Sequence, residues 1–107
     1  MVLDLRFTSD FDADLARLAR RHPDWAVEVR DVVYEELRHD GCVAEAYAPH
    51  VLGRAGGAYL GCVEFHALDD VLVVYSPVRP KRLVTLRRIC THAELSAGVF
   101  GRKWPDE

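Results

Sequence analysis

The chain has 107 residues, of which 50% are hydrophobic and 29% are charged, and its formal net charge is −3. This composition is typical of a globular domain and excludes a disordered chain. The length allows one hydrophobic core, so we expect residues 1–107 to form a single domain. No apolar run approaches the roughly 20 residues of a membrane helix, and residues 1–6 lack the layout of a secretory signal, which together predict a cytoplasmic protein without membrane contact.

The charge is unevenly distributed along the chain. Residues 1–48 carry 11 Asp and Glu against 6 Lys and Arg, whereas residues 49–107 carry 6 against 8. A surface that binds an anion is therefore expected in the second half of the chain.

The first half of the chain predicts a strand followed by two helices. Alternating apolar and polar residues at 2–7 favour a strand. Ser9 can then cap a helix whose first turn carries acidic residues at Asp10, Asp12 and Asp14, where the helix dipole favours negative charge. A second helix restarts at Pro23 and ends at a glycine, Gly41. Apolar residues at helical spacing predict an antiparallel helical hairpin; they are Phe11, Leu15, Leu18, Trp25, Val29, Val32, Val33 and Leu37.

The second half predicts three strands and a short final helix. A glycine-rich loop at 53–57 precedes them, and a rigid basic turn is expected at 76–81. The expected strands are 58–66, 71–76 and 82–89. A helix is expected from Ala93 to Gly98 or Gly101. The element order is β-α-α-β-β-β-α, which indicates an α+β domain with a mainly antiparallel sheet and the helical hairpin on one face.

Candidate catalytic residues lie near the ends of these segments. Alternation along the first of the three strands places Glu64 and His66 together, on the expected open face of the sheet. Asp70 follows across the next turn, close enough to orient the His66 imidazole. His50 precedes the glycine-rich loop, and His92 follows the last strand. Sites are commonly built at such segment ends.

These residue types suit the cleavage of RNA by its own 2′-hydroxyl group. Histidine suits both proton transfers of that reaction, because its ordinary pKa lies near neutrality. A carboxylate such as Glu64 or Asp70 can fix an imidazole tautomer or act as the base. Lysine and arginine can stabilise the pentavalent phosphate, so that no metal or other cofactor is required. The candidate RNA-binding residues are Arg54, Lys81, Arg87 and Arg88.

Two other interpretations of these residues are open. A single histidine is more often an ordinary surface side chain than a catalytic group. A zinc site is a sharper alternative, because Cys62, His66, Cys90 and His92 offer two thiolates and two imidazoles. Strand residues four apart are separated by roughly 13 Å, which argues against that site. The three cysteines, with Cys42 the third, fit better as small buried residues outside any disulfide framework.

Four segments, taken in order, resemble the YafQ family of bacterial toxins within the RelE/ParE toxin superfamily. They are Arg20 to Trp25, Pro49 to Gly53, Glu64 to Tyr75 and Arg88 to Leu95, so the resemblance covers nearly the whole chain. It implies a RelE-like fold and a ribosome-dependent endoribonuclease that cuts messenger RNA in the A site of the 70S ribosome and is silenced by a cognate antitoxin. The family's roles would fall on His50, His66, Asp70 and His92, with Glu64 where the family often has Asp.

The chain also departs from the pattern that it resembles. Val71 stands where the family usually has Trp, Ser96 stands where it usually has Phe, and Cys90 replaces a glycine. Phe100 is a candidate substitute for the second aromatic residue. Two alternative functions are a ParE-like toxin that poisons DNA gyrase by protein contacts, and an inactive homologue that only binds antitoxin. In each case we expect an antitoxin to bind an exposed apolar groove through an amphipathic helix or an added strand.

Overall fold

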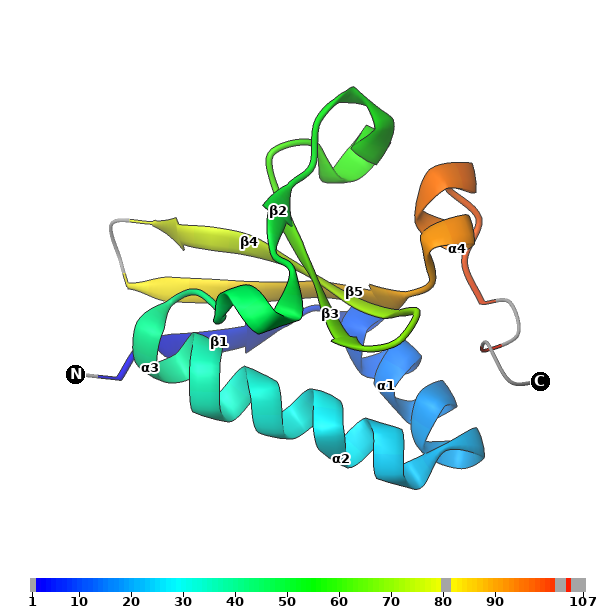
Figure 1. The fold of residues 1–107 in the computed structure, drawn as a ribbon, viewed down its shortest axis with the longest axis horizontal. Helices are drawn as coiled ribbons and strands as arrows, with labels where there is room; N and C mark the ends of the chain where they lie inside the picture. The colour runs from blue at the N-terminus through cyan, green and yellow to red at the C-terminus, as the bar shows by residue number, and fades with distance from the viewer. Residues whose placement is uncertain (1, 80–81, 102–103, 105–107) are drawn as a thin grey trace.

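In the computed structural model, the described residues are 2–79, 82–101 and 104, and the side chains of 54–56, 78 and 79 are not among them. Five strands form one sheet in the order β1-β5-β4-β3-β2 (Figure 1). Their bounds are β1 Asp4–Phe7, β2 His50–Val51, β3 Val63–Leu68, β4 Val71–Arg79 and β5 Leu83–Cys90. β1 pairs with β5 in parallel, and the other neighbours are antiparallel. The expected α+β class is confirmed.

Helices α1 (Ser9–Arg21) and α2 (Pro23–Val32) form the predicted hairpin on one face of the sheet (Figure 1). α2 continues through a π-helical turn (Val33–Leu37) into α3 (Arg38–Asp40), and the whole run ends at Gly41 with φ 72°. The remaining helical segments are the 3₁₀ turns η2 (Glu45–Tyr47) and η3 (Arg54–Tyr59) and helix α4 (His92–Ala97). Among the described residues, no helix combines the length and the hydropathy that crossing a bilayer requires.

Helix α1 is capped by Thr8 and not by the expected Ser9. The Thr8 hydroxyl accepts a hydrogen bond from the Phe11 N–H at 3.1 Å and donates one to the Arg87 carbonyl at 3.0 Å. Serine and threonine are both good caps, so the local sequence does not choose between them. The contact with β5 decides in favour of Thr8, and it fixes the start of α1 against the sheet.

The main core lies between the helical hairpin and the sheet. The apolar helix faces that the sequence predicts are buried there, although Leu15 and Trp25 are only partly buried. The innermost side chains are Phe11, Leu18, Val29, Val33, Leu37, Phe65, Val73, Val84, Leu86 and Ile89, each at most 1% exposed. This packing fixes which strand residues face the helices and which face the opposite side.

The opposite face of the sheet is not open, contrary to expectation. Helix α4 and the segment 52–62 fold over it and bury a second apolar cluster, made of Leu52, Cys62, Leu72, Val74, Cys90 and Leu95. Glu64 lies on this face and is therefore only 2% exposed. Alternation along the strand predicts the correct face for Glu64 but not its burial. The burial is due to α4 and the segment 52–62, whose packing over this face the local pattern does not indicate.

The strand predicted for 58–66 is shorter than expected. Its first residues form the turn η3 and the link after it, and β3 begins only at Val63. Gly57 and Gly61 have φ angles of 55° and 85°, which interrupt extended backbone and suit glycine. The two-residue strand β2, which pairs with β3, was not expected at all.

The basic turn predicted for 76–81 is only partly correct, because β4 extends through Pro77 to Arg79. A proline removes one ladder hydrogen bond and is tolerated at bulges. The pairing of β4 with β5 shifts register between Ser76 and Arg79, on either side of Pro77. Lys81 lies outside the described residues.

Candidate active site

Three distant segments bring their polar side chains to one place. The antiparallel pairing of β2 with β3 places His50 opposite Glu64, and directly opposite residues share a face of the sheet. His66 follows on that face of β3 two residues later. His92 opens α4 just beyond the end of β5. The structure thus brings together His50, Glu64, His66 and His92, which we call the histidine cluster.

Glu64 is the centre of the histidine cluster. One carboxylate oxygen, Oε1, contacts Nε2 of His50 and lies 3.9 Å from Nε2 of His92. The other oxygen, Oε2, is buried and has no hydrogen-bond partner among the described residues. A buried, unpaired carboxylate oxygen costs free energy in the folded state and is rare outside functional sites. Its position beneath the two imidazoles therefore points to a role in chemistry or in ligand binding.

The position of His92 is fixed by Asp70 and by the capping box at the start of α4. Asp70 Oδ1 accepts a hydrogen bond from the His92 backbone N–H at 2.9 Å and lies 3.1 Å from the ring Nδ1. Thr91 and Glu94 form a capping box at the start of α4, with hydrogen bonds of 3.2 and 3.0 Å. A carboxylate only accepts hydrogen bonds, so Nδ1 carries the proton and Nε2 is the nitrogen left for chemistry.

His66 is oriented by a backbone carbonyl and not, as expected, by Asp70. Its Nδ1 lies 3.1 Å from the carbonyl oxygen of Asp69, the first turn residue after β3, which has φ 35°. Asp70 instead turns toward α4. The rings of His66 and His92 lie side by side, with centroids 5.0 Å apart. The short separation in sequence favoured a pair of Asp70 with His66, whereas the fold brings Asp70 within hydrogen-bonding distance of His92.

The imidazoles of His50 and His92 are exposed to solvent, whereas the Glu64 carboxylate that contacts them is buried. The side chains of His50 and His92 are 56% and 54% exposed, whereas that of Glu64 is 2% exposed. His50 also has its Nδ1 3.3 Å from the Ala48 carbonyl. A substrate could reach the imidazoles from solvent, while the buried carboxylate holds them from beneath.

The same cluster could hold a metal ion. Glu64, His66 and His92 each offer a ligand atom, and these atoms lie within 4.8 Å of one another. The zinc site considered from the sequence is not formed, because no cysteine belongs to a potential ligand group in the described part of the chain. All three cysteines are free, and burial raises the pKa of the Cys90 thiol well above its usual value, which disfavours the thiolate that a metal needs.

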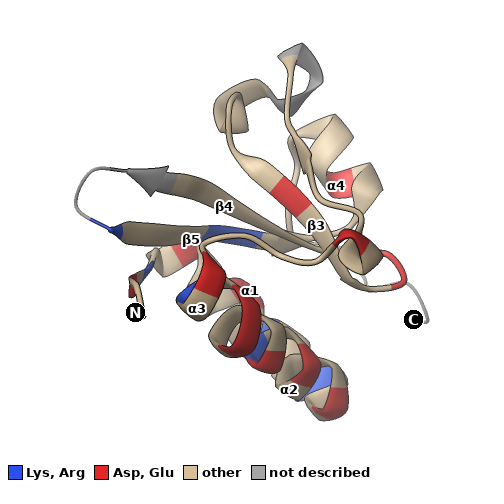
Figure 2. Cartoon of the chain, turned by 60° about the vertical axis from the view of Figure 1, so that its left-hand side comes forward, with Lys and Arg blue, Asp and Glu red and all other residues tan. Residues whose placement is uncertain are grey.

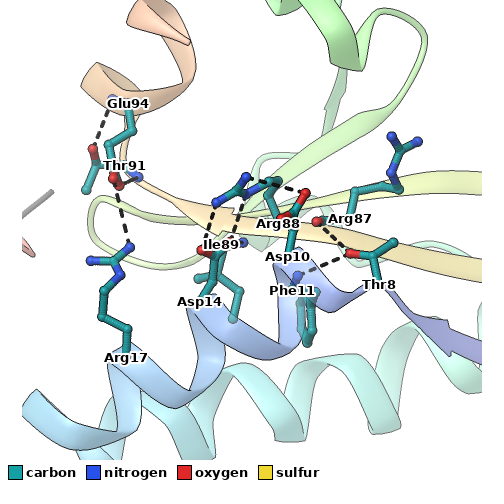
Figure 3. A network of polar contacts seen from close by, with 10 residues as sticks. All are labelled: Thr8, Asp10, Phe11, Asp14, Arg17, Arg87, Arg88, Ile89, Thr91 and Glu94. Carbon is teal, nitrogen blue, oxygen red and sulfur yellow. Dashed lines mark hydrogen bonds and ion pairs between the residues drawn. The ribbon is translucent and has the colours of Figure 1, made fainter. Parts of the chain in front are cut away.

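Arg88 forms an ion pair with Asp14, a residue whose burial was not expected from the sequence. Its Nε and Nη2 each donate to Asp14 at 2.9 Å, and the Ile89 N–H donates to the same carboxylate at 2.9 Å (Figure 3). Asp14 was expected at an exposed helix start but is 3% exposed. Burial raises its pKa, and the hydrogen bonds from Arg88 and Ile89 oppose that rise. The pairing of β1 with β5 ends at Leu86, so Asp14 takes the place of a strand partner for Ile89.

Arg87 is the more available of the two adjacent arginines. Its Nη1 lies 3.4 Å from the Ser76 hydroxyl, and its guanidinium lies 5.4 Å from the centroid of the Tyr59 ring. Within the described residues no carboxylate pairs with it. Acidic residues are most frequent on helices α1, α2 and α3, and β3 and α4 carry fewer of them (Figure 2). Of the other expected RNA-binding residues, the Arg54 side chain, like Lys81, lies outside the described part.

Comparison with known proteins identifies the kind of molecule that carries this cluster. A family model for YafQ, a bacterial toxin of type II toxin–antitoxin systems, matches residues 3–97. The solved E. coli DinJ–YafQ complex aligns with a TM-score of 0.68 and 20% identity, over 87% of this chain and 97% of that chain. A search of curated protein sequences finds no match.

Two further solved structures share the fold. A metal-bound toxin from Helicobacter pylori aligns with a TM-score of 0.62 and 26% identity, over 87% of this chain and 98% of that chain. The RelBE2 toxin–antitoxin complex from Mycobacterium tuberculosis aligns with a TM-score of 0.63 and 17% identity, over 86% of this chain and 100% of that chain. The RelE-like fold expected from the sequence is confirmed.

Proposed function

Because the chain belongs to the YafQ family of type II toxin–antitoxin toxins, we propose that it is a ribosome-dependent endoribonuclease that cuts messenger RNA. The observation that carries the proposal is the meeting of His50, His66 and His92 around the buried carboxylate of Glu64. Two neighbouring, solvent-accessible imidazoles supply the base and the acid that RNA cleavage requires.

The proposed reaction is an attack by the 2′-hydroxyl oxygen on the adjacent phosphorus. His66 removes the 2′-hydroxyl proton as the new O–P bond forms. His92 acts as the imidazolium, with protons on both ring nitrogens; it keeps the Nδ1 proton toward Asp70 and gives the Nε2 proton to the 5′-oxygen as the old P–O bond breaks, which leaves a 2′,3′-cyclic phosphate and a 5′-hydroxyl. Asp70 holds the ring of His92 through Nδ1, and Glu64 holds His50 beside the reacting groups. Each step moves a proton or an electron pair between named groups, and no redox partner is needed.

Positive charge near the phosphate completes the proposed mechanism. Arg87 is the most available of the described candidates, because no carboxylate of the described residues neutralises it. Arg88 donates two hydrogen bonds to Asp14, so its contribution is mainly to hold the edge of the sheet. Arg54 and Lys81 remain proposed contacts to the RNA backbone.

A cognate antitoxin is the proposed protein partner, and the cytoplasm, where ribosomes work, is the proposed location. The DinJ–YafQ and RelBE2 structures are complexes of this kind, which supports the proposal. A hollow of about 440 Å³ between α1 and α2 is lined mainly by apolar residues, among them Leu15, Pro23 and Val27. Such a groove suits the amphipathic helix expected from the sequence.

The proposal is tested in a cell-free translation reaction. Purified protein is added, and cuts in the messenger RNA are mapped by primer extension. We expect cuts with the wild type and with His39→Gln, an exposed histidine on α3 outside the cluster. We expect none with His66→Gln or His92→Gln. Equal cutting by His92→Gln would refute the mechanism. In a second experiment the protein is expressed in bacteria, where growth arrest with DNA breaks but intact messenger RNA would support a ParE-like action instead.

A further inference from the structure

Helix α4 is too short to hold its own position. It has six residues, and an isolated helix shorter than about 12 residues is marginal in water. Its place against the sheet therefore depends on contacts with other elements. Because α4 begins at His92, the contacts that fix this helix also fix the imidazole to which the proposed mechanism assigns the role of the acid.

One of these contacts comes from α1, which packs against the other face of the sheet. Glu94 in the first turn of α4 is fully buried, and its Oε1 accepts a hydrogen bond from the Thr91 N–H at 3.0 Å. Its Oε2 lies 3.9 Å from Nη2 of Arg17 on α1 (Figure 3). A buried carboxylate depends on such a partner, because removing it leaves an uncompensated charge. One side chain thus joins the capping box next to His92 to a distant helix.

The guanidinium of Arg17 is itself held by an aromatic ring. It lies 4.3 Å from the ring centroid of Trp104, a residue that is 2% exposed and belongs to the main core. A cation at this distance from an indole face is attracted to the ring. The ring also excludes water from one side of Arg17, which strengthens the attraction between Arg17 and Glu94.

The same part of the chain covers a second arginine. The guanidinium of Arg88, which pairs with Asp14 of α1, lies 4.0 Å from the ring centroid of Phe100. The family model ends at residue 97, so both aromatic rings come from residues beyond the match. We call the described residues after it, 98–101 and 104, the C-terminal extension. Its two rings lie over the two arginines whose carboxylate partners connect α1 to β5 and α1 to α4.

We propose that the C-terminal extension positions the acid of the cleavage reaction. Trp104 holds Arg17 against Glu94. Glu94 in turn fixes the start of α4, and with it the contact between His92 and Asp70. Trp104, Arg17 and Glu94 are positioning residues, because they act on the imidazole only through α4. This inference rests on the proposed nuclease function, which gives His92 its role.

Two variants break this connection and leave the capping box in place. Glu94→Gln keeps an oxygen for the Thr91 N–H, as glutamine does in capping boxes, but loses the charge that attracts Arg17. Trp104→Leu keeps an apolar side chain but removes the ring face. We expect each to lower kcat for messenger RNA cleavage on ribosomes about 10- to 100-fold, because a displaced acid slows the chemical step. KM should change less than about twofold, since RNA binding is unaffected. Trp104→Phe keeps a ring and should recover most of the lost kcat.

A spectroscopic measurement tests the positioning without any cleavage. The ¹⁵N shifts of the two ring nitrogens of His92 are recorded in alkaline solution, where imidazoles are neutral. We expect a proton fixed on Nδ1 in the wild type and in Trp104→Phe. In Glu94→Gln and Trp104→Leu we expect shifts averaged between the two tautomers, because the ring is no longer held on Asp70. Wild-type ring shifts in either of these two variants would overturn the proposal, as would a wild-type kcat.

The matched control separates positioning from loss of stability. Leu37→Val shortens a fully buried side chain next to α3, which lies at the other end of the molecule from α4 (Figure 1). It should lower Tm by a few degrees and leave kcat and the His92 ring shifts unchanged. If Leu37→Val reduced kcat and averaged the ring shifts as Glu94→Gln does, general destabilisation would explain the effect and the proposal would be wrong.

The two proposals fail in different ways. If the wild type cuts no RNA but the His92 ring shifts change in Glu94→Gln and Trp104→Leu, the nuclease function is wrong and the positioning of the ring stands. If both variants cut messenger RNA at the wild-type rate and with wild-type ring shifts, while His92→Gln does not cut, the nuclease function stands and the C-terminal extension has no part in it.

Discussion

One oxygen of Asp70 receives both the backbone N–H and the ring Nδ1 of His92, at 2.9 and 3.1 Å. The two residues are 22 positions apart, so this contact joins the turn between β3 and β4 to the start of α4. It also selects the imidazole tautomer, because Oδ1 can only accept. Nε2 of His92 is left 3.9 Å from Glu64, at the centre of the histidine cluster.

Asp70→Asn should lower RNA cleavage at least about 10- to 100-fold while the fold is retained, because losing the partner that orients a functional histidine costs that order of activity or more. The amide of Asn can present its N–H₂ group to Nδ1 and release the ring. The matched control is Asp69→Asn in the same turn, where asparagine tolerates φ 35° and no side-chain contact to the cluster is lost. Cleavage rates of the two variants are compared, and equal rates would contradict the role of Asp70.

Glu64→Gln should abolish most cleavage and yet raise thermal stability. The carboxylate is buried and Oε2 is unpartnered among the described residues, so it costs folding free energy that a neutral amide largely avoids. We expect a gain of about 1 kcal/mol, or a few degrees in Tm, by calorimetry. A variant with both lower activity and lower Tm would instead indicate that Glu64 is a structural residue.

Replacing Arg88 should mainly lower stability, whereas replacing Arg87 should mainly weaken RNA binding. Arg88→Ala leaves the buried Asp14 carboxylate without its ion pair, which costs about 3 kcal/mol and lowers Tm by roughly 10 °C or more. Arg87→Ala breaks no ion pair of the described residues, so we expect a stability change within about 0.5 kcal/mol but weaker RNA binding. Chemical denaturation and RNA-binding titrations of both variants check this contrast, and similar stability losses would contradict it.

Metal ions should inhibit the protein and should not be needed for its activity. The proposed reaction uses proton transfer, so protein stripped with a chelator should cut messenger RNA at the full rate. Added Zn²⁺ should occupy Glu64, His66 and His92, whose ligand atoms lie within 4.8 Å, and should block both imidazoles. Calorimetric titration with Zn²⁺ should show binding to the wild type and His39→Gln but not to His92→Gln. Activity that returns only when metal is restored would contradict this prediction.

Stability should fall in alkaline solution because of two buried acids. Burial raises the pKa of Tyr75 from 10.0 to about 12, and it also raises that of Cys90 above the usual 9.0. The stabilisation is complete below the unfolded pKa values and is lost as pH rises, since the unfolded chain ionises first. Each group costs about 1.4 kcal/mol per pH unit in its window. Tyr75→Phe should therefore lose about 1 kcal/mol less than the wild type between pH 10 and 11, where the unfolded tyrosine goes from half to almost fully ionised, as measured by denaturant unfolding.

The membership of the histidine cluster was largely predictable from the sequence. Alternation along β3 places Glu64 and His66 on one face, and the positions of His50 and His92 at segment ends suggest the rest. The pairing that joins His50 to Glu64 was not predictable, because β2 has two residues and carries no periodic pattern. The capping box at Thr91 and Glu94 was readable and was missed; the Thr-x-x-Glu spacing predicts the helix start that positions His92.

Burial was the harder property to predict. Asp14 follows an acidic helix start and suggests an exposed residue, but it is buried because β1 ends before β5 does and leaves the Ile89 N–H to be paired. Glu64 is buried because α4 and the segment 52–62 close over it. Both outcomes depend on contacts between segments that are far apart in sequence, which local patterns do not record.

The most direct test of RNA cleavage by the histidine cluster uses a messenger RNA with one 2′-deoxy nucleotide at a mapped cut site. On programmed ribosomes, the wild-type protein should cut the unmodified message and leave a 2′,3′-cyclic phosphate, and it should leave the deoxy position intact. Cleavage at the deoxy position would contradict attack by the 2′-hydroxyl and, with it, the roles assigned to His66, His92 and Glu64.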